Sequence, residues 1–395
     1  MTALKDDEFM KSVRLGIIGL GNMGLGHADN ITSGKVTRCE ITAVCDPAPE
    51  KIARFPQAKG FTRSSELIRS GAVDAVLIAT PHFDHTVSGI DALQAGLHVL
   101  VEKPISVQKA DCERLIAAQK DSKQIFAAMF QQRTDPAYQK VRELIQGGEL
   151  GKIRRINWII TNWFRPEAYY KLGSWRATWA GEGGGVLLNQ CPHNLDLFQW
   201  FFGMPKRVRG FCGLGRYHDI EVEDDVTAYF EYADGATAVF ITSTGEAPGT
   251  NRLEIAAENG RLVFENDVLI FTKNETPMTE FSRTATKPFA APANKELKFT
   301  FPNRGGQHVE ILQNFVDAIL DGQPLTAPAP EGIHSVELAN AIVLSAAHNQ
   351  TVELPLDAAA YGKFLQSKIA TSRFKPGAKH AHGVITDDLT ASYKR

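Results

Sequence analysis

The pattern of apolar and polar residues changes character about a third of the way along the chain. Before residue 132, short unbroken apolar runs alternate with stretches of helical character. The runs predict buried strands at 13–19, 40–45, 75–79, 97–101 and 125–129, and the stretches between them predict helices at 64–70, 86–95 and 109–121. Strands separated by single helices indicate a parallel sheet with helices on both faces.

Beyond residue 132, apolar positions alternate with polar ones, which is typical of strands with one buried face. Asp234-Gly235 and Asn259-Gly260 interrupt the alternation, and both dipeptides favour tight hairpin turns. We therefore predict an α/β fold whose second part is a large, mostly antiparallel open sheet. Its strands are expected within 152–163, 206–216, 225–243 and 252–272, and its helices at 136–146, 192–202 and 308–320.

A glycine-rich sequence directly follows the first predicted strand. Gly19, Gly21 and Gly24 form a G-x-G-x-x-G pattern, in which the glycines allow a tight turn and a close approach of the backbone to a pyrophosphate. The helix that follows would direct free N–H groups at that anion. Because the pattern lies between a strand and a helix, we predict an N-terminal Rossmann domain that binds a dinucleotide.

Asp46 ends the second predicted strand, where a carboxylate can accept hydrogen bonds from the ribose hydroxyls of the adenosine. The same carboxylate would repel a 2′-phosphate, so the sequence favours NAD over NADP. Lys51 and Arg54 lie nearby and keep NADP open as the alternative.

Composition narrows the possible partners. The formal net charge of −2 gives no reason to expect a nucleic acid or an anionic membrane. No apolar run approaches the length of a membrane helix, and the first residues lack the pattern of a signal peptide. The five cysteines include no C-x-x-C pair, so we expect reduced thiols in the cytoplasm.

His82 and His85 have no third ligand at a suitable spacing, and we predict no metal site.

Three motifs together resemble the glucose–fructose oxidoreductase/inositol dehydrogenase (Gfo/Idh/MocA) family. They are GLGNMG at 19–24, VEKP at 101–104 and GGGVLLNQCPHNLD at 183–196, and the resemblance covers about 13–355. It implies a Rossmann domain joined to an α/β domain whose open sheet commonly makes the subunit interface, so we expect a homodimer or homotetramer. We place the domains at 13–132 and 133–371, with a C-terminal arm at 372–395.

The resemblance also implies catalytic residues, Lys103 and His193, beside the nicotinamide and the reacting carbon. A lysine or a histidine whose pKa lies near the working pH can take the proton of a hydroxyl group. The family often has an aspartate four residues before this histidine, but the chain has Asn189, which cannot titrate. The residues predicted to bind the cofactor are Gly19, Gly21, Asn22, Met23, Gly24, Asp46, Ala79, Thr80, Pro81, His82, His85, Glu102, Lys103, Gln132, Trp175 and Arg176.

Aromatic and polar side chains interleave in the region that would face the substrate. Four of the five tryptophans fall between residues 158 and 179. Ring faces stack on the C–H faces of a polyol, while its hydroxyls need polar partners. We expect Trp158 in the core and Cys191 as a buried thiol. The residues predicted to bind substrate are Lys103, Arg133, Trp163, Tyr170, Arg176, Asn189 and His193.

We therefore predict an NAD(P)-dependent oxidoreductase acting on CH–OH groups. The expected reaction oxidises a secondary hydroxyl of a sugar, glycoside or cyclic polyol to a ketone, with Lys103 and His193 in proton transfer. Two alternatives stay open: an NAD-dependent glycoside hydrolase of the same fold, and a non-catalytic nucleotide-binding regulator.

Overall fold

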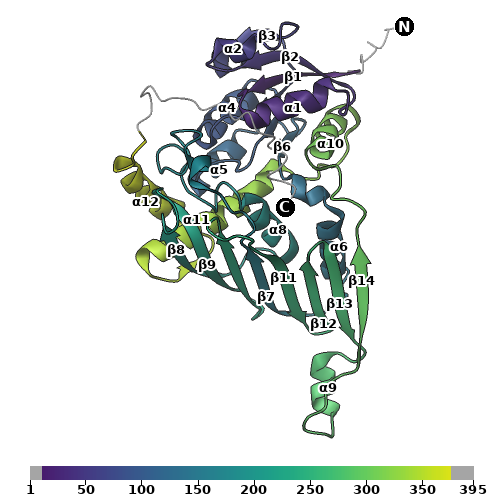
Figure 1. Cartoon of the computed structure of the whole chain (residues 1–395). Coiled ribbons are helices and arrows are strands. Elements are labelled where there is room, and N and C mark those ends of the chain that lie inside the picture. Colours follow the sequence, from purple (N-terminus) through teal and green to yellow (C-terminus); the bar gives the residue numbers. More distant parts are fainter. Residues whose placement is uncertain (1–10, 375–395) are drawn as a thin grey trace, which may run out of the picture. The chain divides into compact units, whose positions relative to one another are not determined.

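The computed structural model describes residues 11–374, which divide into two compact units (Figure 1). Unit 1 comprises the described residues through Ser106, together with Asp111–Gln131 and Gly306–Gly332. Unit 2 comprises Val107–Ala110, Gln132–Gly305 and the described residues from Ile333 onward. Of the predicted C-terminal arm at 372–395, only Ser372–Phe374 belong to the described part, and the rest lies outside it.

Unit 1 contains a six-stranded sheet in the order β3-β2-β1-β4-β5-β6, and every pair in it is parallel. Strand β4 is entirely apolar and buried, and so is β5 after its first residue, His98, as a sheet covered on both faces requires. The strands are β1 (Val13–Ile18), β2 (Cys39–Cys45), β3 (Lys59–Phe61), β4 (Ala75–Ile78), β5 (His98–Val101) and β6 (Phe126–Ala128). The helices in the first part of the chain are α1 (Asn22–Thr32), α2 (Pro49–Ile52), α3 (Ser64–Ile68), α4 (His82–Gln94) and α5 (Lys109–Ala117).

A segment from late in the chain completes unit 1. Helix α10 (Gln307–Asp321) contacts α1 and β1, as Figure 1 also shows. Arg38 forms ion pairs with Asp317 and Asp321 of this helix. The short helix η2 (Ala329–Glu331) contacts β6. By its position along the chain this segment falls in the predicted second domain at 133–371, because nothing in its local pattern shows with which sheet it packs. The division into separate domains stays a prediction.

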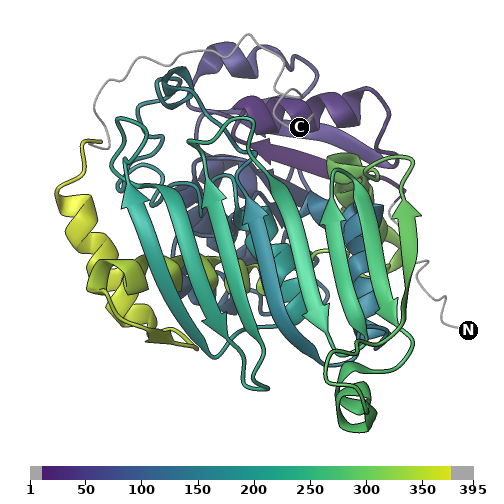
Figure 2. The same cartoon turned by 60° about the horizontal axis from the view of Figure 1, so that its bottom comes forward.

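Unit 2 contains a nine-stranded sheet in the order β14-β13-β12-β11-β7-β10-β9-β8-β15, seen nearly face-on in Figure 2. All its pairs are antiparallel except β7 with β10. Both predicted hairpin turns join neighbouring strands, β9 to β10 and β11 to β12. The strands are β7 (Ile153–Ile160), β8 (Arg207–Leu214), β9 (Glu223–Glu231), β10 (Thr237–Ser243), β11 (Asn251–Ala257), β12 (Gly260–Glu265), β13 (Val268–Asn274), β14 (Asn294–Thr300) and β15 (Val352–Glu353).

An aromatic cluster fixes helix α8 on one face of this sheet. Phe198 of α8 packs 6.5 Å from Trp158 of β7, 5.1 Å from Phe230 of β9 and 6.0 Å from Phe240 of β10, measured between ring centroids. All four side chains are fully buried, so Trp158 belongs to the core as predicted. The helices of unit 2 are η1 (Gln131–Thr134, which begins one residue before the unit), α6 (Pro136–Gln146), α7 (Glu167–Tyr170), α8 (Pro192–Phe202), α9 (Met278–Thr284), α11 (Gly332–His348) and α12 (Ala358–Ala370).

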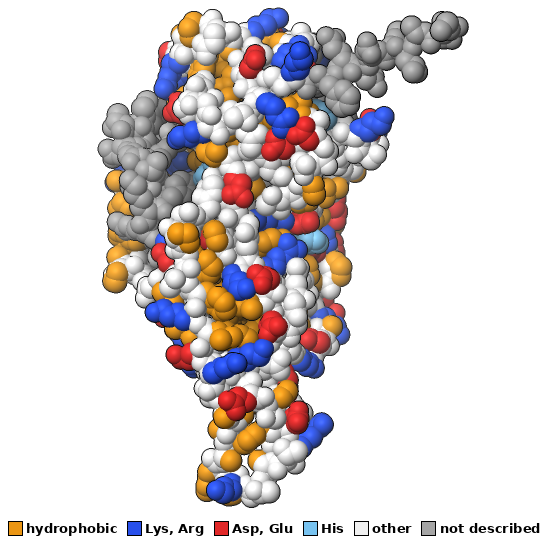
Figure 3. Space-filling view, turned by 90° about the vertical axis from the view of Figure 1, so that its right-hand side faces the viewer, with side chains coloured by type: hydrophobic (Ala, Val, Ile, Leu, Met, Phe, Trp, Pro, Cys, Tyr) orange, Lys and Arg blue, Asp and Glu red, His pale blue; other side chains and the backbone are white. Residues whose placement is uncertain are grey.

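Strands β13 and β14 extend the sheet toward α9, which lies at the tip of their connection (Figure 1). Charged and apolar side chains mix over this lower end in Figure 3. Phe289, in the same connection, is 99% exposed.

A buried ion pair ties η1 to α8. Arg133 Nε and Nη2 donate to the two carboxylate oxygens of Asp196 at 2.7 and 2.6 Å, and both side chains are 1% exposed. Two charges are thus removed from water, which is tolerable only while each neutralises the other.

We expect Asp196→Asn to lower the free energy of unfolding by about 3–5 kcal/mol, because it removes the carboxylate charge that two nitrogens of the buried Arg133 guanidinium contact. Urea denaturation followed by circular dichroism measures this change. Arg63→Ala is the control, since the Arg63–Glu66 pair is exposed and contributes at most about 1 kcal/mol. Equal effects of the two variants would refute a dominant role for the buried pair.

Candidate functional site

Three glycines at the end of β1 meet three different steric demands. A Cβ at Gly19 would lie 2.6 Å from the carbonyl oxygen of Ala79, and its φ of +95° also favours glycine. A Cβ at Gly24 would lie 1.9 Å from the carbonyl oxygen of Gly19. A Cβ at Gly21 would meet no protein atom within 4 Å. The first and third glycines therefore shape the turn, and the second leaves open space in front of it.

Helix α1 begins beside that open space. Its N-cap is Gly21, which has no side chain with which to cap the first turn. The N–H groups there point out of the helix with a partial positive charge, which suits a pyrophosphate. Asn22 and Met23 are partly exposed at the same end.

Asp46 couples the tip of β2 to the glycine turn. Its Oδ2 accepts a hydrogen bond from the backbone N–H of Leu20 at 2.9 Å, and its Oδ1 accepts one from Ala48 at 3.0 Å. Lys51 Nζ lies 3.2 Å from Oδ2. The carboxylate thus orients the turn, and Lys51 partly neutralises the charge that would repel a 2′-phosphate.

The residues after β4 form the next part of this edge of the sheet. Ala79, Thr80 and Pro81 precede α4, and Thr80 Oγ1 is buried without a hydrogen-bond partner among the described atoms. A buried hydroxyl rarely stays unsatisfied, so a bound group would fit here. His85 lies with Nδ1 2.8 Å from the carbonyl of Pro104 and Nε2 2.8 Å from that of Thr80.

His85 therefore joins the loops after β4 and β5. Burial lowers the pKa of His85, against the two carbonyl contacts that favour its charged form. His82, whose ring lies 5.9 Å away, is also buried. Within residues 11–374, no three His, Cys, Asp or Glu side chains gather as metal ligands.

Glu102 anchors the residue that follows it. Its Oε2 accepts the backbone N–H of Lys103 at 3.1 Å, and its Oε1 contacts Nε2 of His27 at 2.7 Å. Burial raises the pKa of Glu102, but the hydrogen bond from His27 and the nearby positive charges outweigh it and lower this pKa to about 2. A permanently ionised carboxylate thus fixes the backbone of Lys103, whose side chain is partly exposed at the end of β5.

His308 lies beside the same carboxylate. Its ring centroid is 5.6 Å from that of His27, and burial together with repulsion from His27 lowers the pKa of His308 to about 4. The contact of His27 with Glu102 was not predicted from the sequence. The position of His27 after the glycines indicates only that it lies on the buried face of α1, and Glu102 is 75 residues away along the chain.

In unit 2, a buried glutamate holds the turn before α8. Glu223 Oε1 accepts the backbone N–H groups of Gly185 at 2.8 Å and Leu187 at 3.1 Å. A Cβ at Gly185 would lie 1.9 Å from the carbonyl oxygen of Glu223, so only glycine allows this approach. The turn leads into α8, where His193 is 3% exposed. Cys191 is a buried thiol, as predicted, 2.9 Å from Thr242 Oγ1.

Several predicted substrate residues come together before α8. Tyr169 OH donates to Asn189 Oδ1 at 3.1 Å, and Arg176 Nη1 donates to the Tyr169 oxygen at 3.0 Å. The Arg176 guanidinium also lies 4.7 Å from the Trp175 ring. Trp163 Nε1 lies 3.4 Å from Asn194 Oδ1. The rings of Trp163 and Tyr169 are partly exposed, as a stacking surface needs to be.

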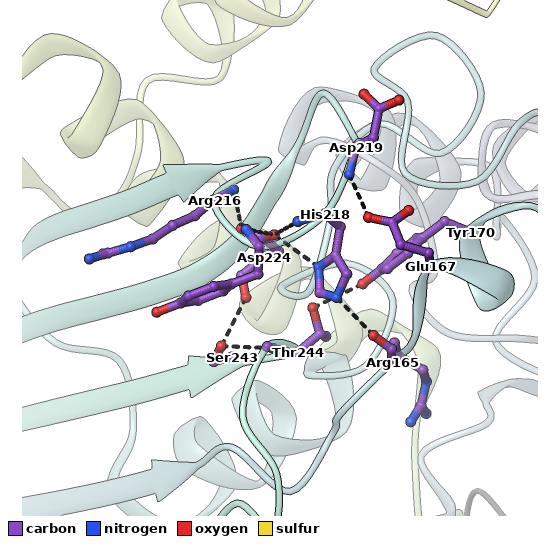
Figure 4. Close-up of polar contacts among 11 residues, drawn as sticks. Arg165, Glu167, Tyr170, Arg216, His218, Asp219, Asp224, Ser243 and Thr244 are labelled. Atoms are coloured by element: carbon purple, nitrogen blue, oxygen red, sulfur yellow. Dashed lines mark hydrogen bonds and ion pairs between the residues drawn. The ribbon is translucent and has the colours of Figure 1, made fainter.

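A second network anchors the loop that carries these rings (Figure 4). His218 lies between Asp224 and the loop, with Nδ1 3.0 Å from Asp224 Oδ2 and Nε2 2.8 Å from the carbonyl of Arg165. Tyr170 OH shares a hydrogen bond of 2.9 Å with Thr244 Oγ1. Asp224 is fully buried and also accepts the backbone N–H groups of residues 216–218. No local motif in the sequence indicates this network.

Two predicted residues differ from the others in their surroundings. Arg133 lies in the buried pair with Asp196, which gives it a structural partner. Gln132 is partly exposed in η1, and its Oε1 has no hydrogen-bond partner among the described atoms. The assignments of individual residues to cofactor or substrate stay predictions.

The glycine turn, the N-terminus of α1 and Asp46 at the tip of β2 define the class: a protein with a dinucleotide-binding Rossmann fold. A family model described as the oxidoreductase family with an NAD-binding Rossmann fold matches residues 13–130, and one for the GFO/IDH/MocA C-terminal domain matches 138–263. The chain belongs to the Gfo/Idh/MocA family. The predicted Rossmann fold, the large sheet, the oxidoreductase class and NAD as cofactor are thereby confirmed.

Among its relatives is an inositol 2-dehydrogenase of Corynebacterium glutamicum, 31% identical over 198 residues. That match covers 49% of this chain and 55% of the relative, so the chain aligns with only about half of that protein. A myo-inositol 2-dehydrogenase of Thermotoga maritima is 24% identical over 87% of this chain and 98% of its own length. The WlbA dehydrogenase of Bordetella pertussis, solved with NADH and UDP-GlcNAcA, has a TM-score of 0.72 at 26% identity, covering 88% of this chain and all of that one.

Three alanine substitutions separate the roles of the glycines. We expect Gly21→Ala to fold normally and to lose NAD affinity, because its methyl group points into the open space. Gly24→Ala should lower the thermal unfolding temperature, since its Cβ would overlap the Gly19 carbonyl. Gly26→Ala, in the same helix with no atom within 4 Å, is the control and should change neither property. Calorimetry measures both quantities, and unchanged NAD binding in Gly21→Ala would contradict the assignment.

Glu223 makes stability depend on pH. Burial raises the pKa of Glu223 to about 7, from 4.5, and the Glu182 carboxylate adds to this rise. The folded state therefore favours the protonated acid, and its stabilising contribution, roughly 3 kcal/mol, is present below the unfolded pKa and is lost as the pH rises through about 7.

We expect the wild type to lose stability relative to Glu223→Gln between pH 4.5 and about 7. The amide keeps an acceptor for Gly185 and does not titrate. Urea denaturation of both proteins over this pH range measures the difference. A difference that does not change with pH would show that the carboxyl does not titrate in this window.

Proposed function

We propose that the protein is an NAD-dependent dehydrogenase that oxidises a secondary hydroxyl of a sugar, glycoside or cyclic polyol to a ketone. The observation that carries the proposal is the joined set of Tyr169, Asn189 and Arg176, in which phenol, amide and guanidinium groups gather on a partly exposed aromatic surface. Rings and hydrogen-bonding groups in this combination suit a hydroxylated ring. The inositol dehydrogenases among the similar proteins, and the WlbA dehydrogenase solved with NADH and UDP-GlcNAcA, support the same substrate class.

The residues around the glycine turn fit a bound NAD. The backbone at Gly21 and the first turn of α1 would hold the pyrophosphate, and Asp46 the adenosine ribose. Bound NAD⁺ supplies the acceptor for the hydride that leaves the carbinol carbon. Thr80 Oγ1, buried without a partner among the described atoms, would satisfy its hydrogen bond on this ligand.

Proton transfer is assigned to Lys103 and His193. The oxidised hydroxyl releases its proton as the ketone forms, and Lys103 Nζ in its neutral form accepts it. Glu102 holds the backbone of Lys103, so the lysine side chain begins from a fixed point. His193, at the start of α8, is the second residue assigned to proton transfer. Lysine and histidine are both side chains that serve as general acids and bases in enzymes.

Asn189 orients the substrate and does not act as a base, because an amide does not titrate. Trp163 and Tyr170 supply ring surface, and Arg176 supplies N–H donors for hydroxyl oxygens. Gln132 Oε1, also without a partner among the described atoms, has an acceptor free for a ligand.

A screen of sugars, glycosides and inositols with NAD⁺, followed by absorbance of the reduced nicotinamide, tests the reaction. On the best substrate, we expect Lys103→Met to reduce kcat by about 10²–10⁴-fold, as for a lost general base, with little change in NAD affinity. His193→Ala should also reduce kcat. Lys120→Met, which removes an exposed lysine of unit 1, should leave turnover unchanged.

Normal turnover of Lys103→Met would refute the proton-transfer assignment. Net hydrolysis of a glycoside without accumulation of NADH would favour the glycoside hydrolase alternative instead. NAD binding with no turnover of any hydroxylated substrate would favour the regulator.

Assembly and location stay predictions. Phe211 of β8 and Tyr229 of β9 are 55% and 38% exposed on one face of the sheet, which is compatible with a homodimer or homotetramer formed through that face. The described part of the chain has no helix that is both long and apolar enough to span a bilayer.

A further inference from the structure

Four side chains of unit 2 form a single polarised chain of hydrogen bonds. Arg176 donates to the oxygen of Tyr169, whose hydroxyl donates to Asn189 Oδ1. Asn189 Nδ2 in turn donates to Oε1 of Glu182. Every donor in the series points toward Glu182, so a cation stands at one end and a carboxylate at the other. Hydrogen bonds aligned in this way strengthen one another.

Glu182 is 2% exposed and well supplied with donors. Its second oxygen, Oε2, accepts the backbone N–H of Ala177 at 2.6 Å. Since both oxygens act as acceptors, the carboxylate can fill this position without carrying a proton. Glu182 thus contacts both Asn189 and the loop that carries Arg176. It is not one of the residues predicted to bind substrate.

The contacts of Asn189 with Glu182 and with Tyr169 explain why an amide suits position 189. Asn189 must donate to Glu182 on one side and accept from Tyr169 on the other, and an amide has one group of each kind. An aspartate there would bring two carboxylates into hydrogen-bonding contact, where both cannot stay ionised. Turning the amide over would place its oxygen against the carboxylate. Glu182 therefore determines which way the amide faces.

We propose that Glu182 is the positioning residue of the substrate surface: it orients the Asn189 amide and, through it, the Tyr169 hydroxyl and the Arg176 guanidinium. This inference rests on the proposed function, since it assigns these groups to the substrate. It adds that Glu182 supplies the acceptor that fixes which way the Asn189 amide faces. The substrate then meets a neutral amide and phenol and a cationic guanidinium.

Exchanging the two groups tests the proposal directly. In Glu182→Gln, the amide at 182 can keep the bond to Ala177 only by directing its N–H groups at those of Asn189. In Asn189→Asp, two carboxylates face each other. In the double variant, the amide introduced at position 182 donates to one oxygen of the carboxylate introduced at position 189. The other oxygen of that carboxylate accepts from Tyr169, so both hydrogen bonds of position 189 are made again, with donor and acceptor exchanged in the bond to position 182.

We expect each single variant to lower kcat/KM by about tenfold or more, and the double variant to recover to within about threefold of wild type, because contacting residues couple strongly. Asn189→Asp should regain activity as the pH falls, since protonation of one carboxyl restores the missing donor. NAD affinity should not change in any of them. Glu280→Gln, which alters an exposed glutamate of α9, is the control.

The same cycle is measured on the thermal unfolding temperature of the free protein, which needs no substrate. Recovery of stability in the double variant supports the positioning role of Glu182 even where the substrate screen finds no substrate. A failure of the proposed function can therefore be told apart from a failure of the role proposed for Glu182. A double variant at least as impaired as the sum of the single ones, in both activity and stability, would overturn that role.

Discussion

Both candidate sites depend on backbone segments that approach more closely than any side chain would allow. In unit 1, the carbonyl of Gly19 occupies the place where a Cβ of residue 24 would lie. In unit 2, the carbonyl of Glu223 does the same at Gly185. The first approach shapes the turn that receives an anion at α1. The second positions the turn from which α8 and His193 start. In each unit, a strand end and a helix start are locked together without any side chain between them.

Buried carboxylates secure these close approaches, and their surroundings determine their charge. Glu102 contacts His27 and lies near Lys103, so positive neighbours outweigh burial and lower its pKa to about 2. Glu223 has backbone N–H donors on one oxygen and the Glu182 carboxylate nearby, so burial prevails and raises its pKa to about 7. Equal burial thus accompanies opposite shifts of the pKa. The anion at Glu102 suits a site that must hold a lysine, whereas the pKa of Glu223 lies near 7 although its backbone N–H donors favour the ionised form.

The sequence predicts most clearly the helices and strands whose local signals agree with the burial that the fold gives them. The helices at 136–146 and 192–202 agree with α6 and α8, since each begins with proline and is followed by glycine, the residues that favour a helix start and a helix end. Helix α11 was missed because it is buried on nearly every side and lacks a polar face. Strand β14 was missed for the opposite reason, since it is a polar, exposed edge strand.

Among site residues, the glycine turn and Asp46 were predictable because a ligand-binding motif lies within one βαβ unit. The partners His27, Glu182 and His218 were not, because each acts through a residue that the fold brings near. His27 reaches Glu102 and His218 reaches Asp224 only in the folded chain. A periodicity or a motif carries no information about such pairs, and a single sequence shows no covariation between them.

The anchoring of the loop at 163–170 has a consequence for the substrate surface. Its backbone is held at Arg165 by His218 and by the N–H bond to the carbonyl of Thr244, and its end is held by Tyr170. Tyr169 lies between these fixed points, and its hydroxyl is committed to Asn189. A ring restrained at its backbone and at its tip loses little further freedom when a ligand binds, so more of the contact energy appears as affinity. The same restraint limits adaptation to other ring shapes. Selectivity among polyols then follows from the direction of the Tyr169, Asn189 and Arg176 groups, which is the direction that Glu182 imposes.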